Sequence, residues 1–382
     1  MQDETARMLA VGGIEINGPN PWDIQVNDPR LYRRIFRHGS LALGESYMDG
    51  WWDCEHLDEF IARILRHRID QSVPKNLNTI AYRLSGVLLN RQSKARAWIV
   101  GREHYDLGND VFEATFDTRI TGSCGYWARA DNLDDSQTAK LDLICRKIGL
   151  KSGQHVLDIG CGWGAFMQFA AAEYGARCTG VTVSENQVEL GRQRCEGLPV
   201  EFRLQDYRDL RGSFDHVVSM GMFEHVGVKN YPIYFDVARR CLKDDGFFLL
   251  HSIGANRTSP VVDPWIDKYI FPNGALPSIK NLGEALESRF VVEDWHNFGP
   301  DYDKTLNAWM AKFDSNWDAL KDKYGERFYR MWRYYLLSCA GGFRARNIHL
   351  WQLVLSKRGA LGGYVPVRCT TRAARGRRPE RL

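Results

Sequence analysis

Short apolar runs alternate with amphipathic stretches along the chain from about residue 153 onward. The apolar runs have the length of buried strands and cover residues 155–160, 176–184, 200–206, 214–220 and 246–253. Helical patterns among them cover residues 165–175, 185–197 and 231–243. Because strands that alternate with helices form parallel sheets covered on both faces, we predict an α/β fold of the doubly wound, Rossmann-like kind.

The first 93 residues follow another pattern, which predicts a small, mostly helical unit. With arginines on the opposite side, residues 55–69 place five apolar side chains at helical spacing: Leu57, Phe60, Ile61, Ile64 and Leu65. A second apolar stripe covers residues 81–100 and has its own basic cluster. The two stripes are either core helices with solvated basic faces or a surface that rests on a membrane.

Composition suits a globular protein with one large domain and a smaller one. The chain has 382 residues, of which 44% are hydrophobic and 26% are charged. No segment approaches the roughly 18 to 20 apolar residues that span a bilayer, and the N-terminus lacks the features of a secretory signal. Nine cysteines without a CxxC pair indicate reduced thiols and no structural metal site. We therefore expect a cytoplasmic protein that binds no metal.

The net charge of +4 is concentrated at the C-terminal end. Between Arg368 and Leu382 there are six arginines and one glutamate, so this segment carries +5 and the rest of the chain about −1. A chain with this distribution is not a general nucleic-acid binder, and we predict no nucleic-acid partner. We expect residues 366–382 to be a disordered basic tail, either merely solvated or in contact with anionic lipid.

Four polar residues stand at or just past the ends of predicted strands. Ligands of open α/β sheets bind beyond the carboxyl ends of the strands. Asp158, Asp206, Glu224 and His251 are therefore expected to converge on one crevice.

The segment "VLDIGCGWG" places Gly160, Cys161, Gly162 and Gly164 in the first turn from strand to helix, just after Asp158. Glycines at such a turn permit positive φ and a close approach of the backbone to a ligand. The spacing is GxGxG rather than the GxGxxG of dinucleotide folds. It is typical of S-adenosyl-L-methionine-binding methyltransferases, and we predict this cofactor.

Further cofactor contacts are expected at the next two strand ends. Many nucleotide-binding sheets end the second strand with an acid for the ribose, but this chain has Thr182 there. Thr182 and Gln187 are predicted to hydrogen-bond the ribose instead. Asp206 suits the adenine amino group, and Tyr207 suits stacking nearby.

Motifs outside the glycine loop make the pattern specific. In order they are "ALGESYMDGWWDC", "GREHYDLGND", "SCGYW", "VLDIGCGWG", "GVTVSENQ", "MFEHVG", "HSIG" and "CAGGFRAR". From about residue 12 to about 357 the chain resembles the bacterial cyclopropane-fatty-acyl-phospholipid synthases. Mycolic acid cyclopropane synthases resemble it only from residue 101 onward. The resemblance implies an N-terminal lipid- or membrane-docking domain at 1–93, a class I methyltransferase domain at 94–365 and the tail at 366–382.

Members of this family transfer a methylene group from S-adenosyl-L-methionine to the cis double bond of an unsaturated phospholipid acyl chain. Methyl transfer leaves a carbocation, and bound bicarbonate removes the proton that closes the ring. The resemblance assigns the catalytic pocket to these residues: Cys124, Glu224, His251, the backbone of Ile253, and Tyr302. It adds Tyr105 as an aromatic near the cation and Cys339 as a second cysteine of interest. It also implies a homodimer at the inner face of the membrane.

Several roles have alternatives. Glu224 either accepts a hydrogen bond from bicarbonate or caps the next helix, and His251 is either a donor to that ion or a satisfied core histidine. The family has tyrosine where this chain has Gly122, so Ser123 or a backbone amide is expected to meet the methionyl carboxylate. The proline-rich segment 258–278 is predicted to cover an acyl tunnel.

Two other functions remain open from the sequence. One is methyl transfer of another kind, either to give a methyl branch on a fatty acyl chain or to a small amine. The other is a lipid-binding protein without chemistry, which the glycine loop together with Glu224, His251 and Tyr302 disfavours.

Overall fold

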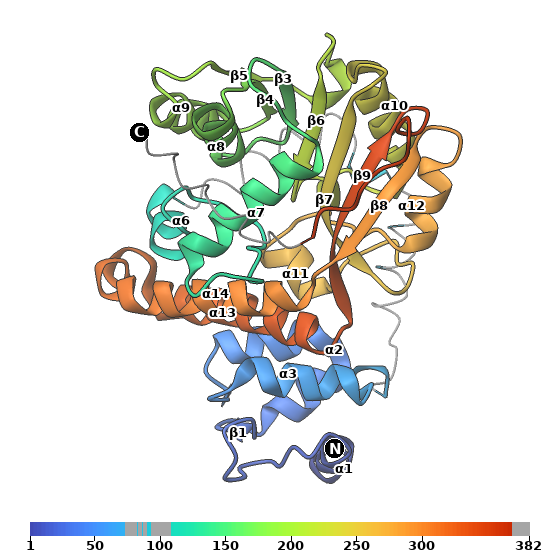
Figure 1. Ribbon diagram of the computed structural model, residues 1–382. Helices are drawn as coiled ribbons and strands as arrows, with labels where there is room; N and C mark the ends of the chain where they lie inside the picture. The colour runs from blue at the N-terminus through green and yellow to red at the C-terminus, as the bar shows by residue number, and fades with distance from the viewer. Residues whose placement is uncertain (73–81, 83–85, 87–89, 93–107, 369–382) are drawn as a thin grey trace, which may run out of the picture.

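The computed structural model describes residues 1–72, 82, 86, 90–92 and 108–368. Its centre is a seven-stranded sheet in the order β5-β4-β3-β6-β7-β9-β8 (Figure 1). Within this sheet, the five strands that come first in the sequence pair in parallel: β3 (His155–Ile159), β4 (Arg177–Thr182), β5 (Val200–Leu204), β6 (His216–Met220) and β7 (Phe247–Ala255). All five predicted strands are thus confirmed.

The sheet also contains two strands that the sequence pattern did not predict. β9 (Ile348–Ser356) lies antiparallel between β7 and β8 (Val291–Asn297). The sheet is therefore mixed rather than wholly parallel. β9 follows the long helix α14 (Lys321–Arg344), so it falls outside the β–α alternation on which the prediction rested.

Helices cover both faces of the sheet, as predicted. On one face α7 (Leu133–Lys147), α8 (Ala165–Tyr174) and α9 (Glu185–Arg194) pack into a core with the strands. On the other face α10 (Tyr231–Cys241) and α12 (Ile279–Leu286) share a second core with them. Short 3₁₀ turns follow β5 at Tyr207–Asp209 and β6 at Phe223–His225 and Val228–Asn230. These turns carry polar residues to the carboxyl edge of the sheet.

The N-terminal segment packs below the sheet in Figure 1. It consists of α1 (Gln2–Ala10), β1 (Gln25–Val26), α2 (Arg30–Met48), β2 (Trp52–Asp53), α3 (Leu57–Arg66) and a 3₁₀ turn at Ile69–Gln71. Its apolar side chains join one core with α6 (Asn109–Thr115), α13 (Pro300–Asn316) and α14. A 3₁₀ turn at Trp317–Ala319 links α13 to α14. Since Leu57, Phe60 and Ile61 are buried, the apolar side of α3 belongs to the protein core.

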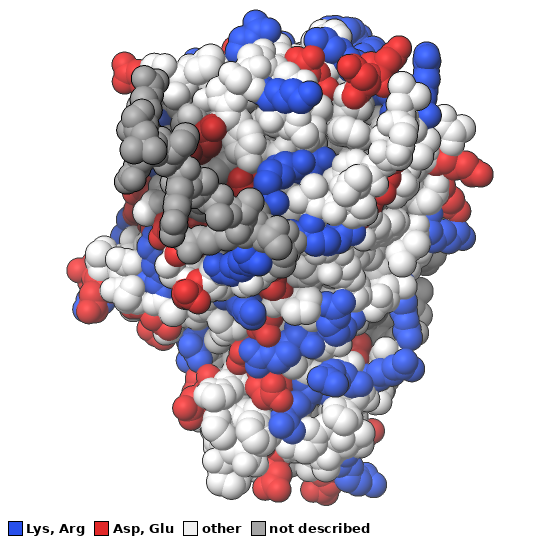
Figure 2. Space-filling view, viewed as in Figure 1, with Lys and Arg blue, Asp and Glu red and all other residues white. Residues whose placement is uncertain are grey.

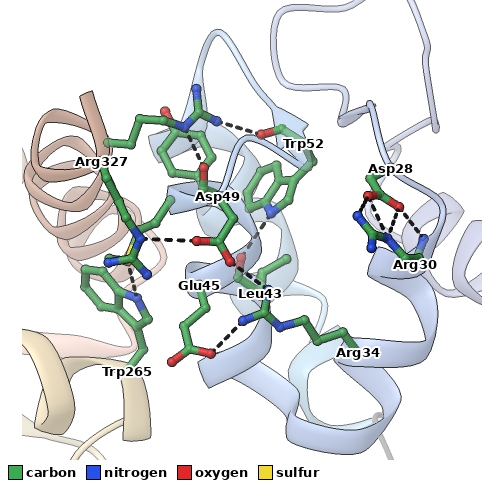
Figure 3. Close-up of polar contacts among 12 residues, drawn as sticks. Asp28, Arg30, Arg34, Leu43, Glu45, Asp49, Trp52, Trp265 and Arg327 are labelled. Carbon is green, nitrogen blue, oxygen red and sulfur yellow. Dashed lines mark hydrogen bonds and ion pairs between the residues drawn. The ribbon is translucent and has the colours of Figure 1, made fainter. Parts of the chain in front are cut away.

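Ion pairs fasten the N-terminal segment to the rest of the chain (Figure 3). Asp49, just after α2, pairs with Arg34 and with Arg327 of α14. Glu45 pairs with Arg34 and with Lys268 of α11 (Pro264–Tyr269). These contacts hold α2 between α11 and α14.

Some predictions fall outside the described residues. Most of the second apolar stripe at 81–100, the domain boundary at 93 and Tyr105 lie there, and membrane docking by residues 1–93 stays a prediction. Of the basic tail, Arg368 forms an ion pair with the buried Asp294, so the described start of this segment packs against the sheet rather than being free in solvent. Within the described ranges, no helix is long and apolar enough to cross a membrane.

Candidate functional site

A cavity of about 200 Å³ opens at the carboxyl ends of β3, β4, β5 and β6. Its lining includes eight of the residues predicted to bind the cofactor: Ser123, Gly160, Cys161, Gly162, Thr182, Gln187, Asp206 and Tyr207. Asp158 and Gly164, which were predicted with them, do not line it. We call this space the first cavity.

The glycine loop turns through the left-handed region at three positions. Gly160, Gly162 and Gly164 have φ of 83°, 54° and 84°, a conformation that residues with a side chain rarely adopt. A Cβ at Gly164 would lie 2.4 Å from the ring of Phe202, whereas a Cβ at Gly162 would meet nothing within 4 Å. Gly164 therefore serves close packing, and Gly162 leaves the space into which a ligand can come near the backbone.

Behind the loop lies a pair of buried opposite charges, of which the sequence analysis recognised only one member. Asp158 is fully buried, and neither of its carboxylate oxygens has a hydrogen-bond partner among the described residues. Burial raises its pKa to about 7, and the charge of Lys140 acts in the opposite direction. Lys140 on α7 is also fully buried, which lowers its pKa to about 8, and its Nζ donates to Ser123 Oγ at 2.8 Å.

Lys140 could have been found from the sequence. It lies on the buried stripe of α7, three residues after Gln137 and four before Ile144, both of which are also buried. A lysine among core positions is uncommon unless it has a partner. The partner of Lys140 is Ser123, which lines the first cavity.

The polar side chains at the strand ends hold one another in place. Thr182 Oγ1 donates to Gln187 Oε1 at 2.6 Å. Asp206 accepts from the backbone N–H of Arg208 at 2.9 Å and from its Nη1 at 2.8 Å. The Arg208 guanidinium also lies 4.7 Å from the centroid of the Tyr207 ring. Arg208, which also lines the first cavity, was not predicted as a site residue.

A second, much larger cavity of about 1340 Å³ lies between the N-terminal segment and the sheet. Glu224, Ile253, Tyr302 and Cys339 line it, as do many residues of the proline-rich segment 258–278. Three aromatic residues of α14 line it as well: Trp332, Tyr334 and Tyr335. The expectation of a single crevice was therefore wrong: Asp206 and Glu224 line different cavities.

The two cavities meet. Gly122, Trp163, Gly221 and His225 line both of them. Gly122 has no side chain at this junction, and a Cβ there would start 3.3 Å from the ring of Phe116. A group held where one cavity reaches this junction is therefore adjacent to the other cavity.

Glu224 lines the second cavity and is the neighbour in sequence of His225 at the junction. Its Oε1 accepts from the backbone N–H of Ile253 at 2.6 Å, whereas its Oε2 is buried and has no partner among the described residues. Burial raises its pKa to about 7. An N-cap role for Glu224 is wrong, because the 3₁₀ turn Phe223–His225 has no side-chain cap and the carboxylate reaches across to β7; the residue does lie in the first turn of this element, which was the other form of the alternative.

Tyr302 on α13 lies close to Glu224 and to both predicted cysteines. Burial raises the pKa of its hydroxyl well above the usual value, and the charges of Cys124, Glu224 and Cys339 act in the same direction. Cys124 is fully buried and lines neither cavity, and burial raises the pKa of its thiol well above the usual value. A thiolate nucleophile at this position is therefore disfavoured.

His251 is placed one layer behind the cavities, since it is buried and lines neither. Its Nδ1 lies 3.1 Å from Gln352 Nε2, whereas its Nε2 has no partner among the described residues. Burial lowers its pKa well below the usual value, so the ring is neutral. It is not a fully satisfied core histidine.

A sheet of this strand order, with a glycine loop after its first parallel strand and a cavity at the carboxyl edge, defines a class I S-adenosyl-L-methionine-dependent methyltransferase. Comparison with known proteins agrees. Residues 92–353 match the family described as mycolic acid cyclopropane synthetase. The cyclopropane-fatty-acyl-phospholipid synthase of Escherichia coli (strain K12) is 53% identical over 351 residues, which are 92% of each chain.

Two further relatives extend the comparison. The probable fatty acid methyltransferase of Pseudomonas putida is 38% identical over 91% of this chain and 90% of its own. The crystal structure of mycolic acid cyclopropane synthase CmaA1 with SAH and CTAB has a TM-score of 0.64 at 33% identity, and covers 68% of this chain and 98% of that one. The chain therefore belongs to the mycolic acid cyclopropane synthetase family, and the resemblance seen in its motifs is confirmed.

Proposed function

We propose that this enzyme transfers a methylene group from S-adenosyl-L-methionine to the cis double bond of an unsaturated phospholipid acyl chain, which becomes a cyclopropane. The observation that carries the proposal is the meeting of two cavities at Gly122, Trp163, Gly221 and His225: the first contains the residues expected to hold the cofactor, and the second is much larger. The second cavity exceeds the roughly 300 to 1000 Å³ of ordinary ligand pockets, which suits a long acyl chain.

The residues of the first cavity fit the cofactor, which when bound supplies an electrophilic methyl group. Asp206 and Tyr207 suit the adenine, and Thr182 and Gln187 suit the ribose. The open space at Gly162 admits the ligand next to the backbone. Asp158, Lys140 and Ser123 lie where the charged amino-acid end would be held, since a buried carboxylate without a partner suits an ammonium group.

The residues around Glu224 fit bicarbonate, which when bound supplies the base that accepts the proton. The unpartnered Oε2 of Glu224 can accept a hydrogen bond from the hydroxyl of such an ion and thereby orient it. Tyr302 can donate its hydroxyl hydrogen toward the same space. His251 contributes only if its neutral ring reaches the ion from behind the cavity wall, and Cys124 contributes only its backbone N–H.

The Pseudomonas putida relative keeps methyl branching of a fatty acyl chain as the second candidate. Cyclopropane formation and methyl branching would use the same two cavities, and they differ in whether the product contains a three-membered ring. Methylation of a small amine is less well supported, because a cavity of about 1340 Å³ lined by aromatic rings does not match a small polar substrate. Cytoplasmic location, peripheral contact with the membrane and a homodimer stay predictions from the resemblance.

The test uses purified protein with labelled S-adenosyl-L-methionine and vesicles of a mono-unsaturated phospholipid. We expect mass spectrometry to show one added CH₂ in the acyl chain, and the product to resist hydrogenation that reduces alkenes. In CO₂-free buffer the rate should fall and return when bicarbonate is added. No added carbon on unsaturated lipid would refute the proposal, and a reducible or branched product would favour the second candidate.

A further inference from the structure

Four arginines line the second cavity in addition to its apolar and aromatic walls. They come from three parts of the chain, at the end of α3, after β7 and after α14: Arg66, Arg68, Arg257 and Arg346. All four are exposed, and none forms an ion pair within the described ranges. A large apolar cavity therefore has unpaired positive charge at its solvent-facing side.

Several other arginines near the same helices do form ion pairs. Arg344 of α14 contacts Asp58, Glu59 and Asp303, and Arg330 contacts Asp53. Figure 2 shows basic side chains interleaved with acidic ones over one face of the molecule. The arginines of the cavity, like Arg33 of α2 and Arg333 of α14, have no such ion pair among the described residues.

Three of the four are linked to one another through their neighbours. The carboxylate of Asp70 interacts electrostatically with both Arg257 and Arg68. Asn256, the residue before Arg257, donates from Nδ2 to the backbone carbonyl of Arg346 at 2.9 Å. We define Arg68, Arg257 and Arg346 as the arginine rim. Asp70 offsets one of its charges, so the rim keeps a net positive charge.

Two residues of the rim stand where helices end. Arg68 has φ of 56° and Arg346 has φ of 59°, both in the left-handed region. Arg68 follows α3 and Arg346 follows α14, and this conformation closes the last turn of each helix: Arg68 donates its backbone N–H to Leu65, and Arg346 donates its own to Phe343. In Arg346 the carbonyl contact from Asn256 is part of what holds this conformation.

We propose that the arginine rim binds the phosphodiester of the phospholipid whose acyl chain occupies the second cavity. The inference rests on the proposed function and adds the recognition of the head group to it. Guanidinium groups suit phosphate because they donate two parallel hydrogen bonds to its oxygens. A cationic rim on an apolar cavity is complementary to an amphiphile with an anionic group at one end.

The test compares two lipids with the same acyl chains in micelles of a neutral detergent. One is palmitoyl-oleoyl phosphatidylglycerol, and the other is palmitoyl-oleoyl glycerol, which lacks the phosphate. For the triple variant Arg68→Gln, Arg257→Gln, Arg346→Gln we expect KM for the phospholipid to rise at least about tenfold, because charged hydrogen bonds are lost. We expect kcat to change little, and the kinetics with palmitoyl-oleoyl glycerol to stay unchanged.

A matched control removes the same charge elsewhere, at Arg33, Arg129 and Arg177, which are exposed and line neither cavity. An equal rise of KM in this control would show general attraction to the lipid surface and overturn the inference. An equal loss of activity of the triple variant on both lipids would overturn the inference as well. If the wild type converts neither lipid, the proposed function itself fails. Thermal unfolding checks that each variant is folded, and the single variant Arg257→Gln replaces the triple one if that is unstable.

Discussion

The two cavities are built in different ways. The first is formed by loops that follow successive strands of the sheet, so its polar residues come from short stretches of the chain. The second is formed by segments far apart in the sequence, from α2 and α3 to α13 and α14. The comparison teaches that the contacts expected for a cofactor are mostly local, whereas the shape of the large cavity depends on how distant helices pack.

Their buried charges differ as well. Behind the first cavity Asp158 is opposed by Lys140, a cation on the neighbouring helix. In the second, Glu224 is stabilised mainly by backbone and hydroxyl hydrogen bonds and has no cation among the groups that shift its pKa. A balanced pair suits a ligand end that carries both charges. An unbalanced carboxylate suits a position where positive charge develops during the reaction.

Replacing this unbalanced carboxylate should have the largest effect. We expect Glu224→Gln to lower product formation by about 10²- to 10⁴-fold, the usual contribution of a positioned acid–base group. Binding of S-adenosylhomocysteine, measured by calorimetry, should stay within about twofold, because Glu224 does not line the first cavity. Full activity of this variant would point to chemistry that needs no base, such as amine methylation.

The pH dependence of turnover should report the same carboxylate. Burial raises the pKa of Glu224 to about 7, so the ionised form that accepts a hydrogen bond is lost as the pH falls below this value. At saturating cofactor and lipid we expect kcat to fall by about tenfold per pH unit below 7. Asp158 titrates in the same range, so S-adenosylhomocysteine binding is measured across the same pH series to separate the two. A kcat that stays constant down to pH 5 would contradict the assignment.

Lys140 provides the matching test of the first cavity. Lys140→Met keeps the length of the side chain and removes the donor to Ser123 Oγ, so we expect S-adenosylhomocysteine to bind about tenfold more weakly. Methylthioadenosine lacks the amino-acid part, and its affinity should be unchanged. Equal weakening of both ligands would show that Lys140 supports the fold of the cavity rather than one end of the cofactor.

The smallest effect is expected at the cysteines. Burial raises the pKa of Cys339 to about 12, and that of Cys124 also rises well above its usual value, so neither thiol is ionised near neutral pH. Cys339→Ala should therefore lower turnover by less than about threefold, through a small change in the wall of the second cavity. A loss comparable to that of Glu224→Gln would require a chemical role for this thiol.

Much of the first cavity was predictable, because its residues follow strands that the apolar pattern reveals. The glycine loop, Thr182, Asp206 and Tyr207 were placed in this way and line the cavity. Lys140 and Arg208 were missed because each acts from outside the motif, one from α7 and one through Asp206. Glu224 was predicted from its place after β6, whereas Tyr302 and Cys339 came from the resemblance, since spacing alone does not bring residues of α13 and α14 to this strand end.

The sequence by itself determined the five parallel strands, the covering of both faces, the glycine loop and the family of the protein. Local periodicity and short motifs record these features, because each depends on residues close together in the chain. Only the tertiary structure decided that β9 runs antiparallel, that the strand-end acids divide between two joined cavities, and that arginines gather at the larger one. These depend on the packing of distant segments, whose contacts leave no period in the sequence.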